Sequence, residues 1–233
     1  MKIKTQWALF YCGFSIMFLL AVQWISRTVT VISEYKPIPR GHTIILDAGH
    51  GGEDGGACDG AGRKESSYNL EITLCLNDLL TFLGYNTSLI RSADVSVYTK
   101  GETIAQKKIS DLKERVRIVN EMDNGILISI HQNHFSDSRY HGAQVFYSKS
   151  GDSENLAKLL QTGFVSTINP GSRRNAKKSE GIYLMDHIFR TGVLIECGFL
   201  SNPQEAHRLS SKSYQQQICS VIAATLSQYL SNT

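Results

Sequence analysis

Short apolar runs alternate with amphipathic stretches from about residue 42 to the C-terminus. The runs have the length of buried strands, and the longer stretches repeat apolar residues with a helical period. The expected strands are 43–47, 87–90, 126–130, 143–147 and 193–195, and the expected helices are 66–83, one opened by Asp111, 154–168 and 214–230. Strands that alternate with helices in this way predict an α/β domain with a largely parallel sheet.

Two of the expected helices have recognisable end signals. Gly84 follows the 66–83 helix, and glycine is common just after a helix C-terminus. Asp111 is followed three residues later by Glu114, a spacing that predicts a capping box at the start of a helix.

The N-terminus has a different character, because the run Trp7–Ile25 contains no charged residue. As a helix it would reach about 28 Å, close to the roughly 30 Å hydrocarbon core of a bilayer. Lys2 and Lys4 precede the run, so the positive-inside rule places them in the cytoplasm and the rest of the chain outside. Ala21-Val22-Gln23 is a poor cleavage site, which favours an uncleaved membrane anchor over a cleaved signal peptide.

This division predicts three parts of the chain. Residues 1–27 form the membrane anchor or signal segment, 28–41 form a linker, and 42–233 form the compact domain. The linker contains Pro37 and Pro39, two of the four prolines of the chain.

Composition and charge mainly exclude alternatives. Hydrophobic residues make up 42% and charged residues 19% of the chain, as in ordinary globular proteins. The formal net charge of +3 is too small to indicate nucleic-acid binding, although it suits an anionic wall polymer or membrane. The cysteines include no CxxC pair, so they predict neither a disulfide framework nor a thiolate zinc site.

Ionisable residues follow three of the expected strands. His50 lies just past the first strand, His131 follows Ile126–Ile130, and Glu196 follows Val193–Ile195. The carboxyl ends of parallel strands face one edge of an open α/β sheet, where binding sites form. We therefore expect these three side chains to converge if their strands are parallel and adjacent.

Glu65 is a fourth candidate, because it lies where a glycine-rich loop meets the 66–83 helix. Two imidazoles and one carboxylate make a catalytic zinc set with a position open for water, and a carboxylate outside the metal shell can act as general base. Each residue taken alone also has a structural interpretation, such as a Glu65 that complements the helix dipole. The loop lacks the G-K-[ST] sequence of a phosphate-binding loop.

Four separated motifs resemble those of the N-acetylmuramoyl-L-alanine amidase family often called amidase 3. In chain order they are Asp47-Ala48-Gly49-His50-Gly51-Gly52 with Asp54 and Gly55-Gly56-Ala57, then Lys64-Glu65, then Ser129-Ile130-His131-Gln132-Asn133, then Leu194-Ile195-Glu196-Cys197-Gly198-Phe199-Leu200-Ser201-Asn202. The resemblance covers about His42 to the C-terminus. It implies a single α/β domain whose twisted, mixed, largely parallel sheet has about six strands flanked by helices, here preceded by the N-terminal transmembrane or signal helix.

The resemblance also implies roles for individual residues. His50, Glu65 and His131 would hold one zinc ion per chain, and Glu196 would be the catalytic residue. The substrate would be peptidoglycan, cut at the amide bond between N-acetylmuramic acid and L-alanine. Ala48 departs from the proline usual in the family, but no ligand is lost.

Asp47, Arg91 and Asn133 are further candidates at positions that match the family. Asp47 has two interpretations of equal weight: a group that orients His50, as metal-bound histidines usually need, or a cap at the strand end. Arg91 and Asn133 would support the site or contact the substrate.

A narrower resemblance is to germination-specific amidases of endospore formers. It rests on the stretch 91–120, on Gly181–Met185 and on the single N-terminal apolar segment. It implies action outside the cytoplasm, in the cell envelope or between the forespore membranes, where muramic-δ-lactam forms in the cortex.

Other interpretations stay open at this stage. The chain could be a non-catalytic wall-binding protein on the amidase fold, or a zinc peptidase that cuts within the stem peptide. A partner protein that controls zinc loading is also left open. Arg173-Arg174 and Lys177-Lys178 either line a channel for carboxylate-bearing stem peptides or form a solvated charge cluster.

Overall fold

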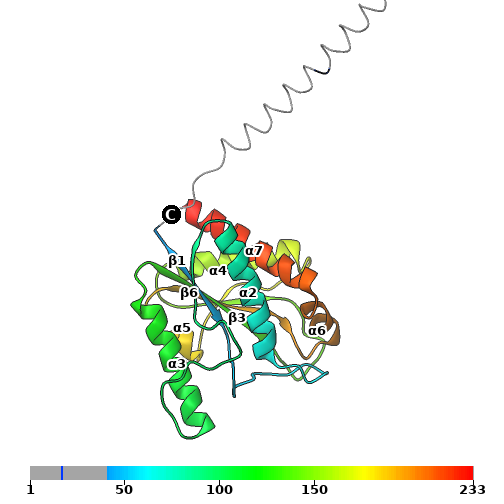
Figure 1. Ribbon diagram of the computed structural model, residues 1–233. Helices are drawn as coiled ribbons and strands as arrows, with labels where there is room; N and C mark the ends of the chain where they lie inside the picture. Colours follow the sequence, from blue (N-terminus) through cyan, green and yellow to red (C-terminus); the bar gives the residue numbers. More distant parts are fainter. Residues whose placement is uncertain (1–16, 18–40, 233) are drawn as a thin grey trace, which may run out of the picture. The chain divides into compact units, whose positions relative to one another are not determined.

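A six-stranded sheet lies at the centre of the domain in the computed structural model (Figure 1). Its strands are β1 (Thr43–Ala48), β2 (Asn86–Leu89), β3 (Gly125–Asn133), β4 (Gln144–Tyr147), β5 (Lys177–Lys178) and β6 (Thr191–Phe199). The order across the sheet is β2-β1-β3-β6-β4-β5. The first four of these are parallel, β4 is antiparallel to β6, and β5 is parallel to β4. The expected mixed, largely parallel sheet of about six strands is confirmed.

The structure describes residue 17 and residues 41–232. The predicted membrane segment, apart from Met17, and the predicted linker up to residue 40 therefore lie outside the described residues. Within the described part, no helix combines the length and the apolar character that a bilayer crossing requires.

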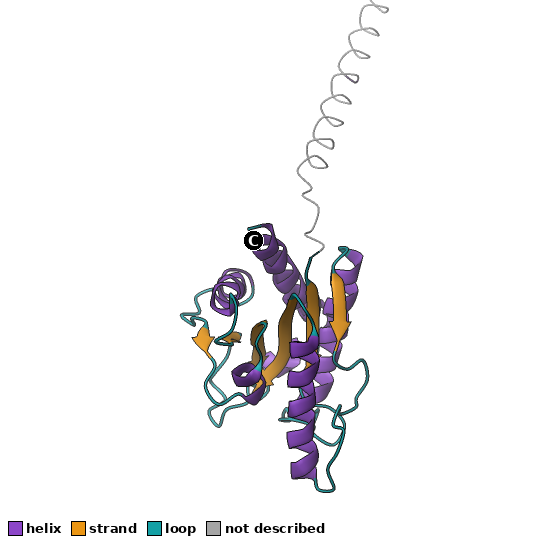
Figure 2. Ribbon diagram, turned by 90° about the vertical axis from the view of Figure 1, so that its left-hand side faces the viewer, coloured by secondary structure: helices purple, strands orange, loops and turns teal. Residues whose placement is uncertain are grey.

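Helices cover both faces of the sheet (Figure 2). They are α2 (Glu65–Phe82), α3 (Ile104–Glu121), α4 (Ser153–Thr167), α5 (Tyr183–His187), α6 (Pro203–Leu209) and α7 (Lys212–Ser231). The larger core cluster joins one face of the sheet to α2, α4 and α7, and a smaller cluster joins the other face to α3 and α5. Both faces of the central strands are thus buried, which explains their continuous apolar runs.

Alternate residues of each central strand point to opposite faces. In β3, Ile126, Ile128 and Ile130 belong to the larger cluster, whereas Leu127 belongs to the smaller one. Because the period of a strand is two residues, His131 lies on the face of Leu127, toward the α3 side.

The start of α3 differs from the expectation. The helix begins at Ile104, and Thr103 forms the capping box with Gln106. Asp111 lies inside the helix, where its carboxylate accepts hydrogen bonds from the Val97 backbone N–H at 2.6 Å and from Arg115. The prediction of a helix opened by Asp111 is wrong, because this carboxylate makes tertiary contacts and the earlier Thr-x-x-Gln pattern caps the helix.

Three short elements were not expected from the pattern: β5, α5 and α6. A two-residue charged strand such as β5 is typical of a sheet edge. The helix α6 has a clear local signal, since Asn202 caps it and Pro203 occupies its first turn.

Candidate active site

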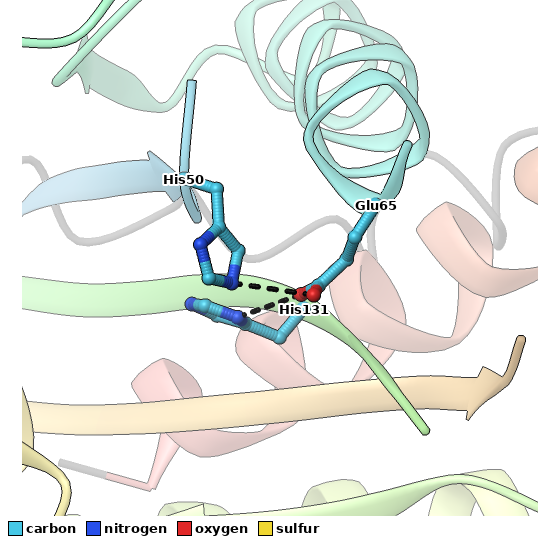
Figure 3. Close-up of side chains that lie close together, drawn as sticks. All are labelled: His50, Glu65 and His131. Atoms are coloured by element: carbon cyan, nitrogen blue, oxygen red, sulfur yellow. Dashed lines mark hydrogen bonds and ion pairs between the residues drawn. The ribbon is translucent and has the colours of Figure 1, made fainter. Parts of the chain in front are cut away.

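Three side chains from separate elements meet at the carboxyl edge of the central strands (Figure 3). His50 follows β1, Glu65 is the first residue of α2, and His131 lies near the end of β3. Glu65 Oε2 is 3.2 Å from His50 Nε2, and Glu65 Oε1 is 3.0 Å from His131 Nδ1. One ligand atom of each residue lies within 4.8 Å of the others. The structure thus brings together the three residues predicted to hold zinc.

Glu65 is buried and held from several sides. Besides the two histidines, its carboxylate accepts hydrogen bonds from the backbone N–H groups of Ala57, at 3.1 Å, and Gln132, at 3.2 Å. Burial raises the pKa of the carboxyl group, but the hydrogen bonds from His131 and His50 outweigh it and hold the pKa well below its usual range. Glu65 is therefore ionised at neutral pH, the state in which a carboxylate can bind a metal ion.

Asp54 orients the imidazole of His50. The Asp54 Oδ2 atom is 2.8 Å from His50 Nδ1, which leaves Nε2 to face Glu65. Burial lowers the pKa of His50, but Asp54 and Glu65 outweigh it and raise this pKa to about 9. A carboxylate behind the second ring nitrogen is the usual support for a metal-bound histidine.

Of the two interpretations of Asp47, the one in which it orients His50 is wrong, because Asp54 occupies His50 Nδ1. Asp47 is fully buried, where it accepts a hydrogen bond from Ser129 Oγ at 2.6 Å and pairs with the guanidinium of Arg115. Asp54, rather than Asp47, orients the ring of His50. The sequence could have indicated this role, because Asp54 is an acidic residue four positions after His50 in a glycine-rich loop.

Arg91 and Arg115 hold the backbone of the His50 loop. Arg91 Nε donates to the Ala48 carbonyl at 2.7 Å and Nη2 to the Gly49 carbonyl at 3.0 Å, while Arg115 Nη2 donates to the His50 carbonyl at 2.7 Å. Both arginines are buried. Arg91 thus holds the loop that carries His50. Arg115, which comes from the middle of α3, has a similar position and was not predicted from the sequence.

Two glycines of the loop make room for the ligands. A Cβ atom at Gly49 would lie 2.1 Å from His131 Nε2, and one at Gly56, where φ is +67°, would lie 2.5 Å from Glu65 Oε2. His50 itself has φ of 60°, a left-handed conformation that costs energy for a residue with a side chain. The glycine-rich sequence is thus required by the close approach of the three ligands.

Glu196 lies directly beside the three-residue group. It pairs in register with His131 across the parallel strands β3 and β6, so the two side chains emerge on the same face. Its Oε2 atom is buried and has no hydrogen-bond partner. Burial raises the pKa of Glu196 to about 7. A carboxyl group with this pKa can exchange a proton near neutral pH, as a general base must.

Asn133 lies two residues beyond His131, at the end of β3. Asn133 is partly exposed, and its side chain makes no hydrogen bond to another described residue. Its backbone carbonyl accepts a hydrogen bond from the Leu200 N–H at 2.8 Å, at the bulge where β3 and β6 end. The amide of Asn133 is thus available to a ligand at this edge.

The residues fit a catalytic zinc site. Two imidazole nitrogens and one carboxylate are present, one imidazole is backed by Asp54, and the unpartnered Oε2 of Glu196 is nearby. Three protein ligands leave room for a water molecule and a substrate atom. An α/β sheet that carries such a group at its carboxyl edge is the arrangement expected of a metal-dependent hydrolase.

Comparison with known proteins specifies the family. The family model for N-acetylmuramoyl-L-alanine amidases matches residues 44–228, and the chain belongs to this family. The germination-specific N-acetylmuramoyl-L-alanine amidase of Bacillus subtilis (strain 168) is 35% identical over 234 residues, which cover 98% of this chain and 96% of that protein. Both resemblances predicted from the motifs are confirmed.

Solved structures agree with this assignment. One is the CwlD amidase from Clostridioides difficile, determined in complex with the GerS lipoprotein. Its sequence is 39% identical to this chain, and the TM-score is 0.79. The matched region covers 82% of this chain and 100% of the CwlD chain. A second is an N-acetylmuramoyl-L-alanine amidase from Clostridium difficile 630, which is 25% identical to this chain with a TM-score of 0.73. The matched region covers 84% of this chain and 100% of that amidase chain.

Proposed function

We propose that this chain is a zinc-dependent amidase that hydrolyses the bond between N-acetylmuramic acid and L-alanine in spore peptidoglycan. The family and its amidase activity rest on the match over residues 44–228 and on the germination-specific relative. The observation that carries the proposal is Glu196, which stands in register with His131 and has one buried carboxylate oxygen, Oε2, without a hydrogen-bond partner. A wall-binding protein without catalysis would have no use for such a costly group.

Zinc is the metal that this set of donors favours, with one ion per chain. His50, Glu65 and His131 would hold it, because mixed nitrogen and carboxylate ligands in a three-residue set are typical of catalytic zinc. Elemental analysis of the purified protein should find about one zinc per chain and a strong reduction in His131→Ala. His207→Ala, which changes an exposed histidine of α6, is the control. Equal zinc in wild type and His131→Ala would remove His131 from the site.

The chain's own residues divide the chemical work. Bound zinc would supply a Lewis acid that polarises the scissile carbonyl and activates water for attack. Glu196, whose Oε2 atom is unpartnered, accepts the proton released by the attacking water. Because burial raises its pKa to about 7, it can then hand this proton to the leaving amine of L-alanine. Glu65 cannot replace it, since both Glu65 oxygens contact the histidines.

Identification of the cleaved bond tests the proposed function. Zinc-loaded protein incubated with spore-type peptidoglycan should release stem peptides that begin with free L-alanine and leave a free lactyl carboxylate on muramic acid. Mass spectrometry distinguishes these products from others. Cleavage within the stem peptide would show a zinc peptidase, and binding without any cleavage would show a wall-binding protein.

The proposed place of action is outside the cytoplasm, in the bacterial envelope or between the forespore membranes. The amidase family supports the envelope, and the uncharged run Trp7–Ile25 supports attachment through an N-terminal anchor. The full-length protein should therefore fractionate with membranes and keep its N-terminal residues. N-terminal sequencing that starts near residue 26 would show instead a cleaved signal peptide.

Peptidoglycan is the proposed substrate partner, and a protein partner is also proposed. The support for the second is that the CwlD amidase of Clostridioides difficile was solved with the GerS lipoprotein. Affinity purification of the full-length chain from sporulating cells should therefore recover a lipoprotein. Recovery of the chain alone under mild detergent would contradict this expectation.

A further inference from the structure

A basic groove opens at the same edge of the sheet as the active site. It has a volume of about 680 Å³ and is lined by the segments 137–141 and 171–174. These segments lead into β4 and β5. Because β4 is antiparallel to β6 and β5 is parallel to β4, both strands begin at the edge where β3 and β6 end. The groove therefore lies on the catalytic edge of the domain.

Arg174 connects the groove to the surroundings of Glu196. Its Nε donates to the His141 carbonyl at 3.2 Å, and its Nη1 donates to Gln144 Oε1 at 3.3 Å. Gln144 lies opposite Glu196 in the register of β4 and β6. The guanidinium also lies over the ring of Phe199, with Cζ 5.1 Å from the ring centroid. Arg174 is thus a fixed cation, bonded to the side chain of the residue that pairs with Glu196 across β4 and β6.

The positive charge of the groove is only partly neutralised. Arg139 is paired with Asp137 at 2.7 Å. Arg173 and Arg174 have no carboxylate partner within the described part of the chain, although Arg174 is partly buried. Two guanidinium groups are therefore left with donors for an anion, and a guanidinium suits a carboxylate because it can donate two parallel hydrogen bonds. A solvated charge cluster would not need Arg174 to be fixed by two hydrogen bonds and an aromatic ring.

We propose that Arg173 and Arg174 form a subsite that binds a carboxylate of the stem peptide while the L-alanine amide lies at Glu196. This inference rests on the proposed amidase function. The stem peptide extends away from the cleaved bond and carries free carboxylates, and the groove offers the matching charge beside the catalytic edge. Arg174, already held in place, loses little freedom on binding, and exposed Arg173 completes the pair.

The test uses two muropeptides that differ in one group. The residue after L-alanine carries either its free carboxylate or the corresponding carboxamide. Zinc-loaded wild type should have a kcat/KM about tenfold or more higher for the carboxylate, the usual effect of charged hydrogen bonds. Arg173→Gln/Arg174→Gln should lose this preference. Lys177→Gln/Lys178→Gln removes the same charge on β5, outside the groove, and should keep it.

Arg173→Gln alone guards against misfolding, because the Arg173 side chain makes no hydrogen bond to another described residue. It should keep the melting temperature and zinc content of wild type and reduce the preference. Equal turnover of both muropeptides by wild type would overturn the subsite and leave the amidase intact. Variants that keep the preference but lose retention on anionic wall polymer would also overturn it, in favour of a general wall-binding surface. A wild type that cleaves neither muropeptide would overturn the amidase function itself.

Discussion

Asp47 and Glu196 lie on the two strands that flank β3, and each has a buried carboxylate oxygen, yet the surroundings of these oxygens are opposite. Asp47 accepts a hydrogen bond from Ser129 and is paired with Arg115, which outweigh the effect of burial and lower its pKa. Glu196 has an oxygen without any partner, and burial raises its pKa to about 7. The charge of Asp47 is thus balanced by its partners, whereas Glu196 Oε2 has no hydrogen-bond partner.

The difference separates structural from chemical use of a buried charge. A buried carboxylate costs free energy unless it is paired. An unpaired buried carboxylate is therefore typical of a functional site. Asp47 stabilises Arg115, and Arg115 holds the His50 carbonyl in place. Glu196 keeps the basicity that the proposed reaction requires. The expected consequences of substitution therefore differ in kind, and four experiments can break or sharpen this contrast.

The largest expected effect is on turnover at Glu196. Glu196→Gln keeps the size of the side chain and removes its basicity, so turnover should fall by about 10²–10⁴-fold. Zinc content and melting temperature should remain those of wild type. All three quantities are measured on one preparation, with release of stem peptide as the assay. Near-wild-type release would remove Glu196 from the mechanism, and a parallel loss of zinc would make it a metal ligand.

Asp47→Asn should act on stability instead. The substitution leaves the buried guanidinium of Arg115 without one of its carboxylates, a change that typically costs about 3–5 kcal/mol. Urea unfolding measures it. Glu121→Gln, which removes an exposed partner of Arg117 on the same helix, should change stability by less than about 1 kcal/mol. If Asp47→Asn kept full stability and lost turnover, the contrast between the two carboxylates would fail.

Asp54→Asn should weaken the metal site without unfolding the domain. Asparagine can still accept a hydrogen bond from His50 Nδ1 but no longer supports the ring with a charge, so zinc affinity should fall by about 10–100-fold. Competition with a chromophoric chelator gives the affinity. Asp94→Asn is the control, because Asp94 binds the backbone of the same loop at Gly52 and does not contact His50. Equal affinities in the two variants would exclude the role of Asp54.

The smallest expected effect is a pH dependence of zinc stabilisation. Asp54 and Glu65 raise the pKa of His50 in the metal-free protein from 6.5 to about 9. The proton on His50 therefore stabilises the metal-free fold fully below about pH 6.5, and this contribution is lost as the pH rises through about 9. Zinc must displace that proton, so its affinity grows over the same window.

At a buffered free zinc concentration, the melting temperature of zinc-loaded protein minus that of chelator-treated protein should increase from about pH 6.5 to about pH 9. The increase should be complete at a lower pH in Asp54→Asn, because one carboxylate that raises the pKa of His50 has lost its charge. A difference that stays constant with pH in wild type would contradict the protonation of His50 in the metal-free state.

Local patterns were sufficient to predict a largely parallel sheet and the meeting of His50, His131 and Glu196, and the family resemblance added Glu65 to this set. The strands are recognisable because both of their faces are buried, and parallel strands must present their carboxyl ends at one edge. A residue that follows such a strand is therefore placed by its position in the chain. The basic pair Arg173-Arg174 was also visible in the sequence, without an indication of its neighbours.

The partners of the supporting charges were decided by tertiary structure. Asp47 and Asp54 are both acidic and both lie within four residues of His50, so local chemistry cannot choose between them. The choice depends on Arg115, which is 68 positions from Asp47 in the chain, and on the left-handed backbone at His50. Likewise, the sequence around Asp111 predicts a helix cap, but in the folded domain its carboxylate accepts hydrogen bonds from Val97 and Arg115. A charged side chain binds whichever partner the folded chain brings within reach, and that partner is set by packing over the whole domain.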